Sequence, residues 1–168
     1  VSLYSPLWQF RLERSVYLTE RTVRDKQEKM LEYIAAELAA PKEECIESLI
    51  PDDMVIYKYR YDSLFSWSHE FPITNDDITA YSFYFRLQPN NSIDGHPLAY
   101  LNEGKWEYSN LGREWYLLYR KTAEDSRTTL ISGIRLTLNL PEGLCHAPLM
   151  ENPSGAVKGI DGVPVFCI

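Results

Sequence analysis

The chain has 168 residues, of which 45% are hydrophobic and 24% are charged, and its net charge is −7. This composition is typical of a folded domain rather than of a disordered segment, and the length suits one domain with a real core. The acidic charge argues against nucleic acid as a partner, because phosphate binding requires clustered Lys and Arg. No apolar run reaches the roughly 18 to 20 residues that a membrane span requires.

The first organised segment is expected to be a long helix over residues 11–40. Apolar residues recur there at steps of three and four, which places them on one side of a helix. The stripe comprises Leu12, Val16, Val23, Met30, Ile34 and Leu38, with Thr19 and Gln27 at the remaining positions. Pro41 ends the helix, because its ring removes a backbone donor. The helix either packs along its own domain or acts as a stalk or dimerisation helix through residues such as Val16 and Val23, and both can hold.

A short second helix is expected over residues 42–49, and after Pro51 the chain changes to short β-type runs between turns. Strands are predicted at 54–61, 63–68, 79–88, on both sides of Glu103-Gly104, at 113–123, at 127–138 and within 161–168. The run 63–68 should form a hairpin with 54–61, and 127–138 should pair with 113–123. One long helix followed by five to seven antiparallel strands predicts an α+β fold. The chain is interpreted as a single domain, 1–168, with a strand-rich body over 52–168.

Motifs that carry chemistry are missing from the sequence. It has no GxSxG, P-loop or GxGxxG, and its histidines have no metal-ligand spacing. The three cysteines are Cys45, Cys145 and Cys167, and they form no CxxC pair. This count favours neither a disulfide framework nor a zinc site, although a single disulfide bond is an alternative in an oxidising compartment. The sequence therefore predicts a domain that is not an enzyme and holds no metal or cofactor.

Aromatic side chains with polar tips are abundant, with twelve tyrosines and four tryptophans. Ordinary burial accounts for most such rings, yet small-molecule pockets also use aromatic walls with a few polar groups. The candidate ligand-binding residues are Trp67, Tyr84, Arg86, Tyr100, Trp115 and Tyr119.

Three segments together resemble the extracytoplasmic sensor regions of Bacteroidetes-type membrane histidine kinases. The first is YDSLFSWSHEFPI (61–73), with Asp-Ser-Leu at 62–64 and Trp-Ser at 67–68. The second combines Trp-Tyr-Leu at 115–117 with Ile-Ser-Gly-Ile at 131–134, and the third is IDGVPVFCI (160–168). The sequence departs from that pattern at Tyr61, where an Asn is frequent, and in RLTLNLPEG (135–143), which lacks the usual Lys and Tyr.

The resemblance implies a PDC/Cache-like (PAS-like) module, in which a central antiparallel sheet leans on the long helix. The pocket of such a module is the concave face of the sheet, closed by loops. Trp67 would then mark a sheet position, with its neighbouring serines on the opposite face or bonded to loop backbone.

The resemblance also implies a function. The chain would be the ligand-sensing, periplasmic part of an inner-membrane, two-component sensor histidine kinase, with membrane spans outside both ends. An unknown small molecule would bind, and the long helix would move by about 1–2 Å. A homodimer through the N-terminal helix would make that motion bistable. The alternative is a secreted or surface-anchored module that binds a glycan or protein without signalling.

Overall fold

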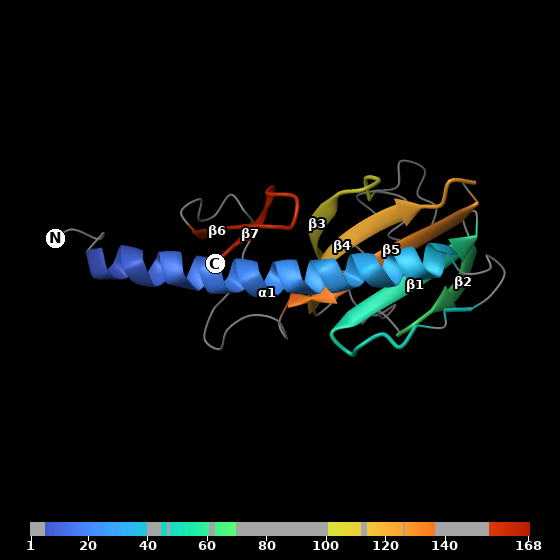
Figure 1. The fold of residues 1–168 in the computed structure, drawn as a ribbon, viewed down its shortest axis with the longest axis horizontal. Coiled ribbons are helices and arrows are strands. Elements are labelled where there is room, and N and C mark those ends of the chain that lie inside the picture. The colour runs from blue at the N-terminus through green and yellow to red at the C-terminus, as the bar shows by residue number, and fades with distance from the viewer. Residues whose placement is uncertain are drawn as a thin grey trace.

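The computed structural model describes residues 6–39, 45–46, 48–60, 63–69, 101–111, 114–125, 127–136 and 155–168. One helix, α1 (Pro6–Ala39), comes first (Figure 1). The strands that follow are β1 (Met54–Arg60), β2 (Ser63–Trp67), β3 (Trp106–Leu111), β4 (Glu114–Thr122), β5 (Thr128–Arg135), β6 (Ala156–Lys158) and β7 (Pro164–Cys167).

Helix α1 begins five residues before its predicted start, at Pro6, because proline is favoured in the first turn of a helix. Its buried residues are Thr19, Val23, Gln27, Met30, Ile34 and Glu37. The first five belong to the predicted stripe, whereas Glu37 was not predicted and the stripe members Leu12, Val16 and Leu38 are only partly buried. From Thr19 onward the helix therefore packs along its own domain. Val23 is only 1% exposed within that core, and dimerisation through the helix stays a prediction.

Strands β1 to β5 form one antiparallel sheet in the order β2-β1-β5-β4-β3. The two predicted pairs are present, since β1 joins β2 and β4 joins β5. The middle of the sheet is in register across three strands, with Ile56 opposite Ser132 and Ser132 opposite Tyr119. Strands β2 and β3 are consecutive in the described chain but lie at opposite edges of the described sheet.

One face of the sheet packs against α1. Met54 and Ile56 of β1, Leu117 of β4 and Leu130 and Ile134 of β5 join the core cluster that includes Val23, Met30 and Ile34 of the helix. Each such side chain contributes about 1.5–3 kcal/mol on full burial. Lys26 also contacts the sheet, because its Nζ lies 2.7 Å from Asp53 Oδ2, just before β1.

Strands β6 and β7 form a hairpin that packs on α1 beside the main sheet (Figure 1). The side-chain oxygen of Gln27 accepts a hydrogen bond from the Ile160 backbone N–H at 2.8 Å, and Glu20 accepts one from Lys158 N–H at 3.1 Å. Phe166 of β7 is buried and stacks on Tyr108 of β3, with 5.7 Å between ring centroids. The hairpin therefore joins α1 to the edge of the sheet.

Two predictions need correction, and one stays untested. Cys45, Ile46 and Ser48–Leu49 are irregular, so the second helix predicted at 42–49 does not form there. Backbone N–H groups of this segment bind side chains instead: Ile46 N donates to Ser66 Oγ and Ser48 N donates to Glu37 Oε1. Strand β6 lies where no strand was predicted, because three residues are too few to show alternation. The strand predicted at 79–88 lies outside the described residues.

Candidate functional site

The face of the sheet opposite α1 is a wall of aromatic and aliphatic side chains. Alternation along each strand places these residues on that side. They are Val55, Tyr57 and Tyr59 of β1, Tyr116 and Leu118 of β4, and Ile131 of β5. All except the partly exposed Tyr57 are buried, and Leu101 packs on them from outside the sheet.

Gly133 lies within this wall, and its neighbours close over the position where a side chain would stand. A Cβ added there would lie 3.1 Å from each of three side chains, namely those of Val55, Tyr116 and Leu118. Contacts this short are tighter than ordinary packing, so glycine is what lets the two flanking strands bring large side chains together.

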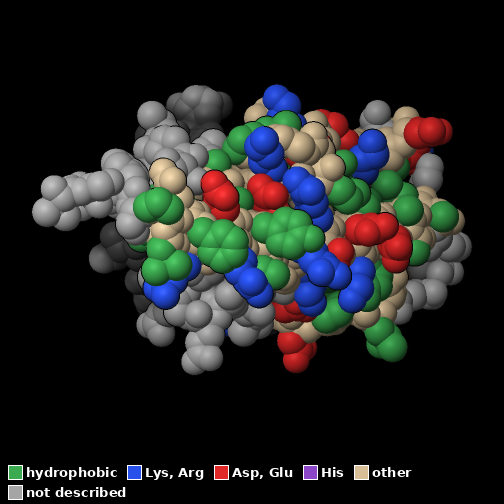
Figure 2. Space-filling view, turned by 60° about the vertical axis from the view of Figure 1, so that its left-hand side comes forward, with side chains coloured by type: hydrophobic (Ala, Val, Ile, Leu, Met, Phe, Trp, Pro, Cys, Tyr) green, Lys and Arg blue, Asp and Glu red, His purple; other side chains and the backbone are tan. Residues whose placement is uncertain are grey.

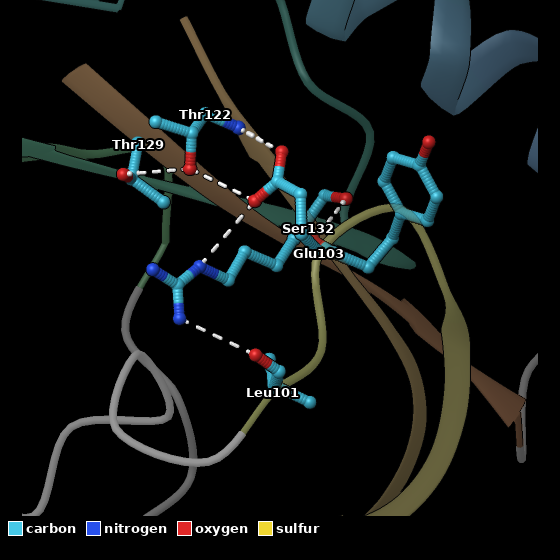
Figure 3. A network of polar contacts seen from close by, with 7 residues as sticks. Leu101, Glu103, Thr122, Thr129 and Ser132 are labelled. Carbon is cyan, nitrogen blue, oxygen red and sulfur yellow. Dashed lines mark hydrogen bonds and ion pairs between the residues drawn. The ribbon is translucent and has the colours of Figure 1, made fainter. Parts of the chain in front are cut away.

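A polar network binds the segment around Glu103 to the end of the β4–β5 hairpin (Figure 3). The Glu103 carboxylate accepts hydrogen bonds from the Thr122 N–H at 2.6 Å and the Thr122 hydroxyl at 2.8 Å. Thr122 Oγ1 lies 3.2 Å from Thr129 Oγ1, and Arg120 Nε lies 3.5 Å from Glu103 Oε2. Arg120 also donates to the Leu101 carbonyl at 3.3 Å. The network thereby holds Leu101 over the wall.

Trp67, the first of the candidate ligand-binding residues, lies on β2 with 51% of its surface exposed. It borders a surface depression of about 420 Å³, which Ser48, Leu49 and His69 also line. Its flanking serines bind backbone: Ser66 Oγ accepts from Ile46 N–H outside the sheet, and Ser68 Oγ accepts from Ile56 N–H of β1. Trp67 is paired with Tyr57 across the strands and therefore belongs to the side of the sheet opposite α1.

Trp115 and Tyr119 lie on the other side of the sheet, the side that faces α1. Trp115 stacks on Tyr108 with centroids 4.4 Å apart, and Tyr119 packs on Trp106 at 4.7 Å. The structure thus separates these two residues from Trp67 instead of gathering all three in one pocket. Tyr84, Arg86 and Tyr100 lie outside the described residues, and ligand binding by any of the six stays a prediction.

Sequence reasoning missed Tyr57, Tyr116 and Arg120, which lie on the wall or at its margin. The signal was present in the alternation of β4, because Trp115 and Tyr116 are neighbours and must point to opposite faces. The pattern alone does not say which face α1 covers, and the prediction selected the residues on the helix side.

The chemistry available to this site is non-covalent recognition. No group of three or more His, Cys, Asp or Glu within the described ranges is placed to hold a metal ion. Cys45 is exposed and Cys167 is buried, and neither forms a disulfide bond, while Cys145 lies outside the described residues. His69 Nε2 lies 3.3 Å from Asp52 Oδ1, but the Asp52 side chain is fully exposed, so this contact is weak. Most of the wall is buried, so its groups nearest to solvent are the partly exposed Tyr57 and the guanidinium of Arg120 at its margin. An aromatic ring beside a few polar groups suits a small organic ligand.

None of the helical residues that the structure describes forms a stretch both long and apolar enough to cross a membrane. Comparisons of the chain with protein-family models, with curated proteins and with solved structures found no match, so the site rests on its own geometry.

Proposed function

We propose that the chain is the ligand-sensing extracytoplasmic domain of a two-component sensor histidine kinase, with a PDC/Cache-like (PAS-like) fold. It would form the periplasmic part of an inner-membrane protein and would not itself catalyse a reaction. Its ligand would be a small molecule bound on the face of the sheet opposite α1.

The observation that carries the proposal is the contact between α1 and the C-terminal hairpin. Gln27 and Glu20 accept hydrogen bonds from the backbone of Ile160 and Lys158, so the first and last elements are joined directly. The C-terminus lies beside α1, on the side of the sheet toward the N-terminus (Figure 1). A displacement of α1 would therefore reach the end of the chain without passing through a flexible linker.

The architecture supports the same proposal. An antiparallel sheet that packs one face on a long N-terminal helix is the arrangement that the resemblance implies, and the wall lies on the other face of this sheet. The strands at the middle of the sheet, β1 and β5, contribute side chains to both faces. A ligand that binds the wall would therefore contact the strands on which α1 rests.

Signalling requires that the ligand bind one arrangement of the wall more tightly than another, because only this difference in affinity shifts the population. The Glu103 network is the described contact that such a ligand would alter first. It closes the segment carrying Leu101 over the wall, and its ion pair is partly exposed and therefore weak.

A thermal-shift screen of metabolites and saccharides on the whole chain tests the proposal. For a ligand that stabilises the chain, Tyr57→Phe should weaken binding, because Tyr57 is a partly exposed member of the wall. Tyr108→Phe removes the same hydroxyl from the α1 side and should leave binding unchanged. The ligand should also change hydrogen exchange at Lys158 and Ile160, where the hairpin meets α1.

A ligand whose binding depends on Trp67 but not on Tyr57, and which leaves exchange at the α1 contact unchanged, would contradict sensing. It would favour the alternative of a glycan- or protein-binding module that uses the exposed indole.

A further inference from the structure

The N-terminal half of α1 presents large apolar side chains to solvent. Leu7, Phe10, Tyr17 and Leu18 are 59%, 60%, 61% and 40% exposed. At about 100° per residue they lie on the side of the helix opposite the buried stripe that begins at Thr19. Single exposed apolar residues are ordinary, whereas a group on one helical face marks an interaction site.

Arginines lie between these residues. Arg11, Arg14 and Arg21 are exposed on the same side of α1. From residue 6 to residue 24 the chain carries four arginines and two glutamates, a net charge of +2 against −7 for the whole chain, which leaves −9 elsewhere. This basic segment ends at residue 24, because Asp25 and Glu28 follow on the same side. We call the exposed surface formed by Leu7, Phe10, Arg11, Arg14, Tyr17, Leu18 and Arg21 the basic face.

The charges on the basic face disfavour a second copy as its partner. In a parallel two-fold pairing, residues seven apart occupy equivalent positions at the seam. Leu7, Arg14 and Arg21 form one such series, so two of its three positions would place arginine opposite arginine. Like charges facing each other oppose association. The partner that suits the basic face is therefore anionic and also has an apolar region that the exposed leucine and aromatic side chains can enter.

We propose that the basic face of α1 binds the surface of an anionic phospholipid membrane. Arginine guanidinium groups would pair with lipid phosphates, while leucine and aromatic side chains would enter the headgroup region. Figure 2 shows hydrophobic, basic and acidic side chains close together on one face of the molecule. The described sheet and hairpin pack on the opposite side of α1, where the buried stripe lies, so these elements leave the basic face open to a membrane.

Vesicle flotation of the whole chain tests this proposal, which does not depend on ligand sensing. The chain should float with vesicles of phosphatidylcholine mixed with phosphatidylglycerol and not with phosphatidylcholine alone. Neutralising one basic residue should weaken binding by about fivefold, so Arg14→Gln with Arg21→Gln should weaken it about twenty-five-fold. The control is Lys121→Gln with Arg127→Gln, which removes the same charge from exposed positions on the sheet and should change little.

Phe10→Ser with Tyr17→Ser should also weaken flotation, and since both side chains are exposed the thermal midpoint should stay unchanged. Equal binding to neutral and anionic vesicles would overturn the proposal, as would full binding by the Arg14 and Arg21 variant. Absence of flotation, with sedimentation showing a dimer that Phe10→Ser with Tyr17→Ser dissociates, would assign the basic face to a second copy instead.

Discussion

Tyr119 is a residue whose surroundings change its acid–base behaviour. It lies partly buried on the α1 side of β4 against Trp106, and its carbonyl accepts a hydrogen bond from the Ser132 hydroxyl at 3.2 Å. Burial raises the pKa of its phenol above the ordinary value of 10.0, and the negative charges of Glu103 and Asp161 raise it further. The folded protein therefore keeps this proton more tightly than the unfolded chain does.

This difference predicts a loss of stability at high pH. Above about pH 10 the unfolded chain releases the Tyr119 proton first, so the free energy of unfolding should fall until the folded form also ionises. Tyr119→Phe keeps the ring and removes the ionisation, so its stability should fall less steeply. Urea unfolding of both proteins at a series of pH values up to about 11 measures the difference. Identical pH dependence in the two proteins would show that Tyr119 is not the group responsible.

Among the elements, the β6–β7 hairpin depends on a close approach to α1. Gly159 lies so near Gln27 that an added Cβ would be 2.9 Å from Nε2 and 3.2 Å from Oε1. Gln27 is fully buried, and its Oε1 accepts the bond from Ile160 N–H. A side chain at position 159 would have to displace the very group that holds the hairpin.

Gly159→Ala should therefore break the hydrogen bond between Gln27 and Ile160. If this hydrogen bond contributes about 1 kcal/mol to stability, its loss should speed hydrogen exchange at the Ile160 amide about fivefold. Gly162→Ala is the matched control: Gly162 has a φ of 77° but open space around it, so alanine strains the hairpin turn without touching Gln27. The Gln27 side-chain amide resonance should shift in the first variant only, and a shift in both would refute the steric explanation.

At the scale of the whole molecule, α1 has two parts with different surroundings. The part from Thr19 onward belongs to the core, and the part before it exposes apolar side chains. The same helix can thus stabilise its own domain and present a separate surface.

Alanine substitutions in the two parts should have unequal effects on stability. Val23→Ala removes buried methyl groups and should lower the free energy of unfolding by about 2 kcal/mol. Leu18→Ala lies five residues away on the exposed side and should change it by no more than about 0.5 kcal/mol. Urea unfolding at several protein concentrations measures both effects. A large, concentration-dependent loss in Leu18→Ala would indicate that this side is buried in an oligomer.

The sequence by itself determined the long helix, its buried stripe and most of the strands. These depend on local periodicity, which neighbouring residues carry whatever the rest of the chain does. The bounds of β1, β2, β4 and β5 agree with their predictions to within a few residues. The stripe positions Thr19 and Gln27 were identified even though they are polar, because their spacing matched that of the apolar residues.

Only the tertiary structure decided the strand order, the side of the sheet that α1 covers, and the place of the C-terminal hairpin. Each depends on contacts between residues far apart in the chain, such as Gln27 with Ile160 or Glu103 with Thr122. Alternation assigns Trp115 and Tyr116 to opposite faces but leaves both faces equivalent until a helix packs on one of them. The alternation of side chains along each strand therefore could not identify which residues form the candidate site.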